Sequence, residues 1–160
     1  MNKMLRSAIW YANYGWHVFP VKAGGKVPLT PNGCKDATRD AEKITEWWTR
    51  KPNANIGVAC GPSGIVVIDL DDDKGGLDAW AELKERLGID DETVTCLTGG
   101  GGMHLYYKAL PGIDIPNSAS KLGPGIDTRG NGGYVLVPPS ITASPYRWEE
   151  GYGPHDKKPA

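Results

Sequence analysis

The stretch that most constrains this chain is an apolar run that ends in acids, at residues 64–73. Five apolar residues, most of them β-branched, lead into alternating carboxylates, and Lys74 and two glycines follow. An apolar run of this length with glycine on both sides is typical of a strand buried on both faces. Because side chains alternate along a strand, Asp69 and Asp71 are expected side by side on one face, at the carboxyl end of that strand.

Two neighbouring carboxylates repel each other unless a cation neutralises them. Carboxylate oxygens are ligands that suit Mg²⁺ or Mn²⁺. We therefore predict that Asp69 and Asp71 bind a divalent cation. The alternative interpretation is a strand end that runs into a solvated acidic turn.

Length and composition limit the class of protein. At 160 residues the chain suits one domain with a single core, and its 22 glycines and 13 prolines predict many turns. The formal net charge of −1 means that nucleic-acid binding requires basic side chains gathered on one face. Three widely spaced cysteines predict reduced thiols in a cytoplasmic protein, without a zinc site. No stretch has the roughly 18 apolar residues of a membrane span, so no membrane association is expected.

Residue periodicity predicts a mixture of helices and strands. Helical spacing is found over residues 4–14, 41–50 and 77–87. Besides the acidic strand, strands are expected over residues 16–21, 55–60, 93–98, 103–108, 127–129 and 134–137. Residues 61–64 are expected to turn the strand before them into an antiparallel neighbour of the acidic strand, and Asn131-Gly132 to close a second hairpin. This pattern indicates a single α+β domain with a mixed or antiparallel sheet over residues 1–151, and a linker that begins at residues 152–160.

A second candidate site follows four consecutive glycines at residues 99–102. Glycine lets the backbone approach a ligand closely and exposes N–H groups, as phosphate sites require. His104 lies two residues after the last of these glycines, on a strand whose alternation places it on one face with Tyr106 and Lys108. We predict that His104 contacts phosphate. The alternative is a flexible hairpin with an incidental histidine.

Further charged residues lie in glycine-rich segments. Asp127 and Arg129 alternate on one short strand and share a face, either as part of a site or as a local salt bridge, and Lys121 precedes them. Lys22 and Lys26 belong to a loop rich in Gly and Pro, which is either solvated or a flap that contacts phosphate or template. Carboxylates that hold two divalent cations can activate a 3′-hydroxyl and stabilise the leaving pyrophosphate, while histidine and basic groups hold a triphosphate.

An ordered set of motifs extends over about residues 4–151. They are Gly15-Trp16-x-Val18-Phe19-Pro20, Gly25-Lys26-x-Pro28, Asn55-Ile56-Gly57-Val58, Ile68-Asp69-Leu70-Asp71, the segment from Gly99 to Tyr107, and Gly123-Pro124-Gly125-Ile126-Asp127-x-Arg129-Gly130. With this set, the chain resembles the N-terminal bifunctional primase/polymerase domain of plasmid, phage and prophage replication proteins, in the archaeo-eukaryotic primase superfamily.

The resemblance implies an RRM-like catalytic core flanked by helices, which makes or extends primers by template-directed nucleotidyl transfer. Asp69, Asp71 and Asp127 match the metal ligands for Mg²⁺ or Mn²⁺, and His104 matches the residue that contacts the nucleotide phosphates. The position of Gly102 often holds serine in the superfamily. Because glycine has no hydroxyl, backbone N–H groups at Gly101 and Gly102 are expected to substitute. Lys121 and Arg129 are expected to bind the nucleotide as well.

The resemblance also implies partners and a setting. The expected partners are a single-stranded DNA template, a dNTP or NTP, and a helicase that is fused to the domain or works with it. The expected setting is the bacterial cytoplasm, with a plasmid- or phage-encoded protein. Relatives with a zinc-binding insertion need a Cys/His cluster, which this sequence lacks.

Two other functions compete with this one. A metal phosphohydrolase of the haloacid dehalogenase kind also places Asp-x-Asp after a buried strand. That family has Thr or Val where this chain has Asp73, and its strands and helices alternate as in a Rossmann fold. A non-catalytic module that binds nucleotide or single-stranded DNA is the other alternative, although binding a polyanion needs no cluster of carboxylates.

Overall fold

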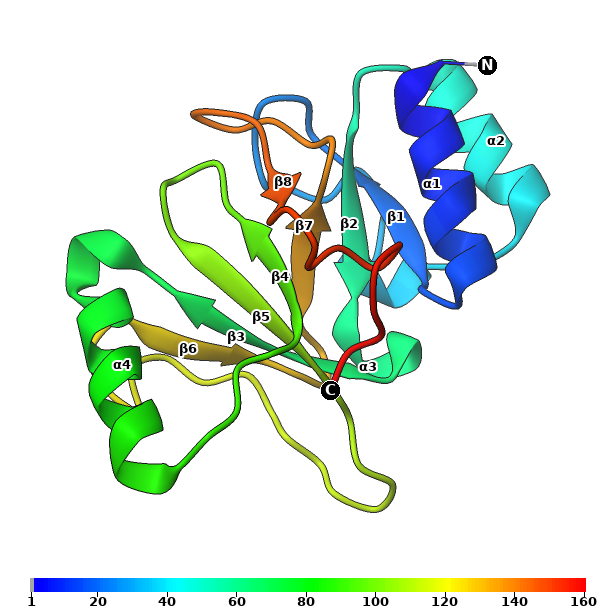
Figure 1. Ribbon diagram of the computed structural model, residues 1–160. Coiled ribbons are helices and arrows are strands. Elements are labelled where there is room, and N and C mark those ends of the chain that lie inside the picture. Colours follow the sequence, from blue (N-terminus) through cyan, green and yellow to red (C-terminus); the bar gives the residue numbers. More distant parts are fainter. Residues whose placement is uncertain (1) are drawn as a thin grey trace.

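Two antiparallel sheets organise the computed structural model, which describes residues 2–160 (Figure 1). The smaller sheet has the order β1-β2-β7 and consists of β1 (Val18–Val21), β2 (Asn55–Ala59) and β7 (Tyr134–Val137). The larger sheet has the order β6-β3-β5-β4-β8 and consists of β6 (Ile126–Arg129), β3 (Ile65–Leu70), β5 (Met103–Lys108), β4 (Val94–Leu97) and β8 (Arg147–Trp148). The acidic strand, β3, is therefore an interior strand, as its apolar run predicts.

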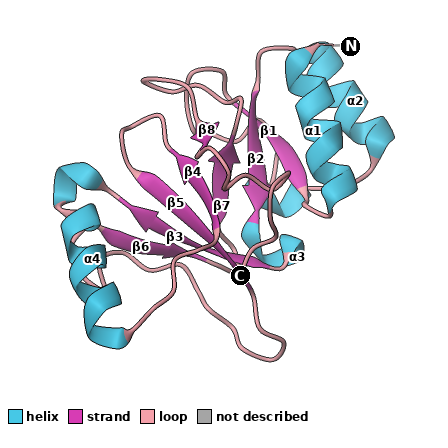
Figure 2. Cartoon of the chain, viewed as in Figure 1, coloured by secondary structure: helices cyan, strands magenta, loops and turns pink. Residues whose placement is uncertain are grey.

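Four α-helices flank the sheets in the described residues (Figure 2). They are α1 (Lys3–Tyr14), α2 (Ala41–Arg50), the one-turn α3 (Cys60–Ser63) and α4 (Gly76–Leu87), and the short 3₁₀ turns are η1 (Gly33–Asp36) and η2 (Asp72–Lys74). Asn2 and Asp40 cap the first two helices, because their side chains accept hydrogen bonds from backbone N–H groups in the first turn. Gly15 ends α1 at φ 116°, a conformation that favours glycine.

The core is divided in two by the larger sheet. One cluster packs α1 and α2 against both sheets and includes Ile65 and Val67 of β3. The other packs α4 against the opposite face of the larger sheet and includes Ile68 and Leu70 of β3. The alternation predicted for this strand is thus confirmed. Asp69 shares the face of Val67, which looks toward the smaller sheet.

The predicted α+β class is confirmed, but two predicted hairpins are wrong. β2 pairs with β1 and β7, and β3 pairs with β5 and β6, so residues 60–64 carry the chain from one sheet to the other. β6 and β7 likewise lie in different sheets, so residues 130–133 form a second crossover. The crossovers lie side by side, because the Cys60 N–H donates to the Gly133 carbonyl over 3.0 Å. β2 and β3 each have partners on both sides, which excludes their pairing with each other, whereas β6 and β7 are edge strands of different sheets.

The C-terminal segment, where a linker is expected to begin, makes tertiary contacts. Residues 152–160 pack against the larger sheet, where the Lys108 N–H donates to the Ala160 carbonyl over 2.7 Å. The Ala160 N–H in turn donates to the Thr93 hydroxyl over 3.0 Å. The His155 ring stacks on Trp10 of α1 with 4.1 Å between ring centroids.

Among residues 2–160, no helix has both the length and the apolar character needed to cross a bilayer.

Candidate active site

The register of the larger sheet brings three site residues into one row. On β3, Asp69 is the direct partner of Asp127 on β6 and of His104 on β5. Directly paired residues of neighbouring strands project from the same face of a sheet. Residues that are 58 and 35 positions from Asp69 in the sequence thereby become its immediate neighbours.

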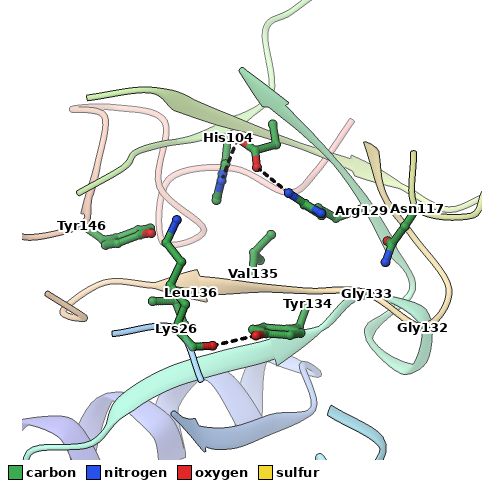
Figure 3. A pocket seen from close by; sticks show the side chains of 11 residues that line it. Lys26, His104, Asn117, Arg129, Gly132, Gly133, Tyr134, Val135, Leu136 and Tyr146 are labelled. Carbon is green, nitrogen blue, oxygen red and sulfur yellow. Dashed lines mark hydrogen bonds and ion pairs between the residues drawn. The ribbon is translucent and has the colours of Figure 1, made fainter. Parts of the chain in front are cut away.

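Short contacts connect this row. The His104 Nε2 atom lies 3.3 Å from one carboxylate oxygen of Asp69. The Arg129 Nη2 atom lies 3.3 Å from the other carboxylate oxygen of Asp69 and 3.4 Å from an oxygen of Asp127. The Asp69 carboxylate therefore contacts both the His104 imidazole and the Arg129 guanidinium, and Figure 3 labels these two side chains. Asp127 and Arg129 therefore belong to a site that includes Asp69, and they are more than a local salt bridge.

These neighbours set the ionisation of Asp69. Burial opposes its negative charge, but the hydrogen bond and charge of His104 and the charge of Arg129 outweigh burial and hold the pKa of this carboxyl below its ordinary value. Asp69 is thus an anion at neutral pH. His104 is itself buried, and its Nδ1 atom has no hydrogen-bond partner within residues 2–160.

Asp71 lies one residue beyond β3 in a tightly held turn. Its backbone N–H donates to the Gly125 carbonyl and its own carbonyl accepts from the Gly76 N–H, each over 2.8 Å. Its side chain accepts a hydrogen bond from the Asp73 N–H over 3.1 Å. The turn holds Asp71 in the lining of a cleft that Asp69 and Asp127 also line.

We call this hollow between the two sheets the central cleft, and it has two halves. The acidic half, of about 310 Å³, is lined by Asp69, Asp71, Asp73, Lys74, Thr98, Gly100, Gly102 and Asp127. The other half, of about 220 Å³, is lined by Asn117 and residues 132–136 and is called here the β7 half. The walls common to both halves are Lys26, Asp69, His104, Arg129 and Tyr146. In Figure 3 the Lys26 side chain extends toward Tyr146 and His104.

A family model described as bifunctional DNA primase/polymerase, N-terminal, matches residues 8–160. The chain belongs to this family. No curated protein matches the chain. The match includes residues 152–160, which agrees with their packing against the sheet.

The glycine turn of this primase/polymerase domain is shaped by close packing. A Cβ atom at Gly102 would lie 2.2 Å from the Leu70 carbonyl oxygen, so only glycine fits in this backbone arrangement. The Gly102 N–H donates to the Thr98 hydroxyl over 3.0 Å, and the Gly101 N–H donates to the Thr98 carbonyl over 3.1 Å. The two amides that were expected to bind nucleotide therefore close the turn here. Of these two glycines, only Gly102 lines the cleft.

The structure divides the predicted lysines. Lys26 lines both halves of the cleft, whereas Lys22 and Lys121 are exposed and line neither half. The loop explains the difference between Lys22 and Lys26. The Lys22 carbonyl accepts a hydrogen bond from the Gly25 N–H, in a turn that directly follows β1. The Tyr134 hydroxyl donates to the Lys26 carbonyl over 2.6 Å, which holds Lys26 beside a residue that lines the cleft.

Sequence reasoning missed several residues that line the cleft. Lys74 and Asp73 directly follow the acidic strand, and their proximity to Asp71 in the chain was a usable signal. Tyr146 and Asn117 come from irregular segments without a motif. Thr98 lines the acidic half and accepts a hydrogen bond from the Gly102 N–H, a contact that the sequence does not indicate. For these three residues, tertiary contacts supply the only signal.

The donor atoms suit a divalent cation, because four carboxylates with hard oxygen ligands line the acidic half. Their present orientation holds a guanidinium. Asp69 and Asp127 face Arg129, and Asp71 faces a backbone N–H. Within residues 2–160, no three His, Cys, Asp or Glu side chains are gathered as ligands of one ion. Cation binding therefore requires rotation of these side chains.

Proposed function

We propose that this domain catalyses template-directed nucleotidyl transfer, in which a primer is made or extended from dNTPs or NTPs on single-stranded DNA. The observation that carries the proposal is the register that places Asp69 between Asp127 and His104, with Asp71 in the same cleft. Membership of the primase/polymerase family supports the same reaction.

Asp69, Asp71 and Asp127 would hold Mg²⁺ or Mn²⁺. Such ions, when bound, supply Lewis-acid stabilisation of the attacking and leaving oxygens. The protein's own contribution is a set of acids whose backbone positions are fixed. Asp69 is kept ionised by its neighbours, and Asp71 is held by two backbone hydrogen bonds in its turn. Because only the side chains must rotate to reach a metal, a fixed backbone limits the reorganisation that the reaction needs.

Basic groups around the acids would bind and orient the triphosphate. Arg129, Lys26 and His104 line both halves of the cleft, and Arg129 and His104 each contact one carboxylate oxygen of Asp69. Charged donors form the strongest hydrogen bonds to phosphate oxygens, and the arginine fork matches them in two places at once. Without these cations, the carboxylates would repel the triphosphate.

The β7 half would then receive the nucleoside. Its walls combine polar Asn117 with the side chain of Val135 and the rings of Tyr134 and Tyr146. A mixed polar and apolar lining is typical of pockets for small organic ligands. We also infer, from the resemblance, that the domain works with a helicase in plasmid- or phage-type replication in the cytoplasm.

The phosphohydrolase alternative requires parallel strands that alternate with helices. Each ladder between named strands in residues 2–160 is antiparallel, which excludes that fold. The binding-only alternative predicts nucleotide or DNA binding without incorporation. Four acids in the cleft oppose it, because carboxylates weaken the binding of a polyanion unless a cation is present.

Single-nucleotide incorporation on a primed template with Mn²⁺ tests the proposal. Asp69→Asn and Asp71→Asn are expected to lower the rate by more than about 100-fold, because cation binding contributes several kcal/mol and each ~1.4 kcal/mol is tenfold. Asp72→Asn is the matched control, because this exposed acid is adjacent to Asp71 and lines neither half of the cleft. Rates for both variants within a few-fold of the control would refute the proposal, as would the absence of incorporation by the unmodified domain.

A further inference from the structure

Arg129 occupies the place between two carboxylates where a cation would bind. A single nitrogen, Nη2, contacts Asp69 over 3.3 Å and Asp127 over 3.4 Å. The carboxylates come from neighbouring strands in direct register, so the guanidinium bridges the β3–β6 ladder. The side chains of Asp69 and Asp127 are only 23% and 24% exposed, so water screens this interaction incompletely.

The guanidinium weakens the attraction of this arrangement for a free cation. Two carboxylates carry −2 and one guanidinium carries +1, so the three side chains together carry −1. Arginine side chains carry a permanent positive charge in proteins, so the charge of Arg129 leaves the site only if the side chain moves. A free divalent ion must therefore displace a resident cation before it can use both carboxylates.

The position of Arg129 also gives it a second binding partner. Its side chain is 35% exposed and lines both halves of the central cleft. Among residues 2–160, its side-chain hydrogen bonds are made by Nη2 alone, so the Nε and Nη1 hydrogens remain available. Free donors of a guanidinium fork are suited to phosphate oxygens.

We propose that Arg129 is an internal counter-cation that makes the acid site select a metal–triphosphate complex over the free metal ion. In the nucleotide-free domain, Arg129 neutralises Asp69 and Asp127 and weakens the binding of a free divalent ion. When the complex enters, Arg129 moves from the carboxylates to the phosphates, and the metal takes its place. This inference rests on the proposed function, because it requires that the acids bind metal.

A different role for Arg129 predicts the opposite result. If Arg129 only holds the two carboxylates in position for the metal, its removal disorders them and weakens metal binding. If it is an internal counter-cation, its removal leaves two adjacent negative charges without a partner. Metal binding then becomes tighter. The sign of the change separates the two roles.

The experiment measures Mn²⁺ binding to the nucleotide-free domain by isothermal titration calorimetry, with the free ion followed by electron paramagnetic resonance. Arg129→Gln is expected to bind Mn²⁺ about tenfold more tightly than the unmodified domain, since a unit charge within ~4–6 Å changes ionic equilibria by about one to three powers of ten. Arg147→Gln is the matched control, because this exposed arginine lines neither half of the cleft. It should bind Mn²⁺ like the unmodified domain.

Further variants and a nucleotide analogue provide controls for this experiment. Arg129→Lys retains the charge and should bind free Mn²⁺ within a few-fold of the unmodified domain. Arg129→Ala also removes the charge and serves as the measure if Arg129→Gln does not fold. Adding a non-hydrolysable dNTP analogue should increase Mn²⁺ affinity more in the unmodified domain than in Arg129→Gln. Equal or weaker Mn²⁺ binding by Arg129→Gln, or equal increases on adding the analogue, overturns the inference.

An Asp69→Asn substitution in the Arg129→Gln background distinguishes this failure from failure of the proposed function. If the double variant still binds Mn²⁺ as tightly as Arg129→Gln, the ion is not bound by Asp69, and the metal assignment in the proposed function is wrong. If the double variant loses Mn²⁺ but Arg129→Gln is no tighter than the unmodified domain, the acid site stands and the counter-cation role of Arg129 is refuted.

Discussion

Gly102 packs directly against Leu70, at the point where β5 begins beside the end of β3. A Cβ atom at residue 102 would lie 2.2 Å from the Leu70 carbonyl oxygen. The neighbouring residues, Asp69 and His104, are partners in the same ladder. The close approach of β5 to β3 at Gly102 therefore helps to position the side chains of Asp69 and His104.

Gly102→Ala is expected to destabilise the domain by about 1–3 kcal/mol, because the added methyl group must push β5 away from backbone atoms of β3. The measurement is the free energy of unfolding by chemical denaturation. Gly100→Ala is the matched control. A Cβ at Gly100 meets nothing within 4 Å, so its free energy of unfolding should change by less than about 0.5 kcal/mol. Equal stability of the two variants would contradict the packing at Gly102.

The local features of this site could be predicted from the sequence. The two faces of β3 follow from strict alternation, and the same rule places His104 with Tyr106 and Asp127 with Arg129. Each rule requires only the sequence neighbours of a residue. The same rule predicts Asp69 and Asp71 side by side on one strand face. Both residues line the acidic half of the cleft, but Asp71 lies just beyond the strand.

The division into two sheets could not be predicted in this way. β2 pairs with β7 across more than 70 residues of sequence, and the short segment 60–64 has the same composition as a hairpin turn. β2 and β3 enter different sheets because each pairs with strands that are distant in the sequence, and this preference is not visible in the local sequence. Tyr146 enters the site for the same reason, because its loop is held by a hydrogen bond from Ser144 to the Gly99 carbonyl.

The three cysteines should differ in reactivity toward a thiol reagent at pH 8. Burial raises the pKa of Cys60 to about 12 and raises the pKa of Cys96 further. A raised pKa keeps a thiol protonated and unreactive at pH 8, whereas Cys34 is partly exposed. We expect one thiol to react with a chromogenic disulfide in the folded domain and three after denaturation. Rapid reaction of two or three thiols before denaturation would contradict this packing.

Lys26 and Lys22 form a natural pair for testing the cleft. Lys26→Ala should raise the KM for the incoming nucleotide about tenfold, because a charged hydrogen bond to phosphate contributes ~1.5–3 kcal/mol. Lys22 lies in the same loop, but it is exposed and lines neither half of the cleft. Lys22→Ala should therefore change the KM for nucleotide less than about twofold. Steady-state incorporation kinetics provide both values. Equal changes in KM would show that loop charge, and not position, matters.

Asp127 and Arg129 should fail in different ways in the same incorporation assay. Asp127→Asn removes a proposed metal ligand, so it is expected to lower kcat by about 100-fold or more at every nucleotide concentration. Arg129→Ala removes a proposed phosphate contact. It should chiefly raise the KM for nucleotide, provided that the contact is equally strong in the ground and transition states. Both assays use saturating Mn²⁺, so that a change in metal affinity does not alter the result.

The double variant decides whether the two residues act together. The Arg129 guanidinium contacts Asp127 over 3.4 Å, and neighbours in contact are not expected to behave additively. Asn at residue 127 cannot hold the guanidinium in the same way, so removing Arg129 from that variant should cost less than removing it from the unmodified domain. An exposed ion pair of about 0–1 kcal/mol would instead leave incorporation nearly unchanged in both single variants. Near-normal kcat for Asp127→Asn would remove Asp127 from the metal site and leave Asp69 and Asp71 as its proposed ligands.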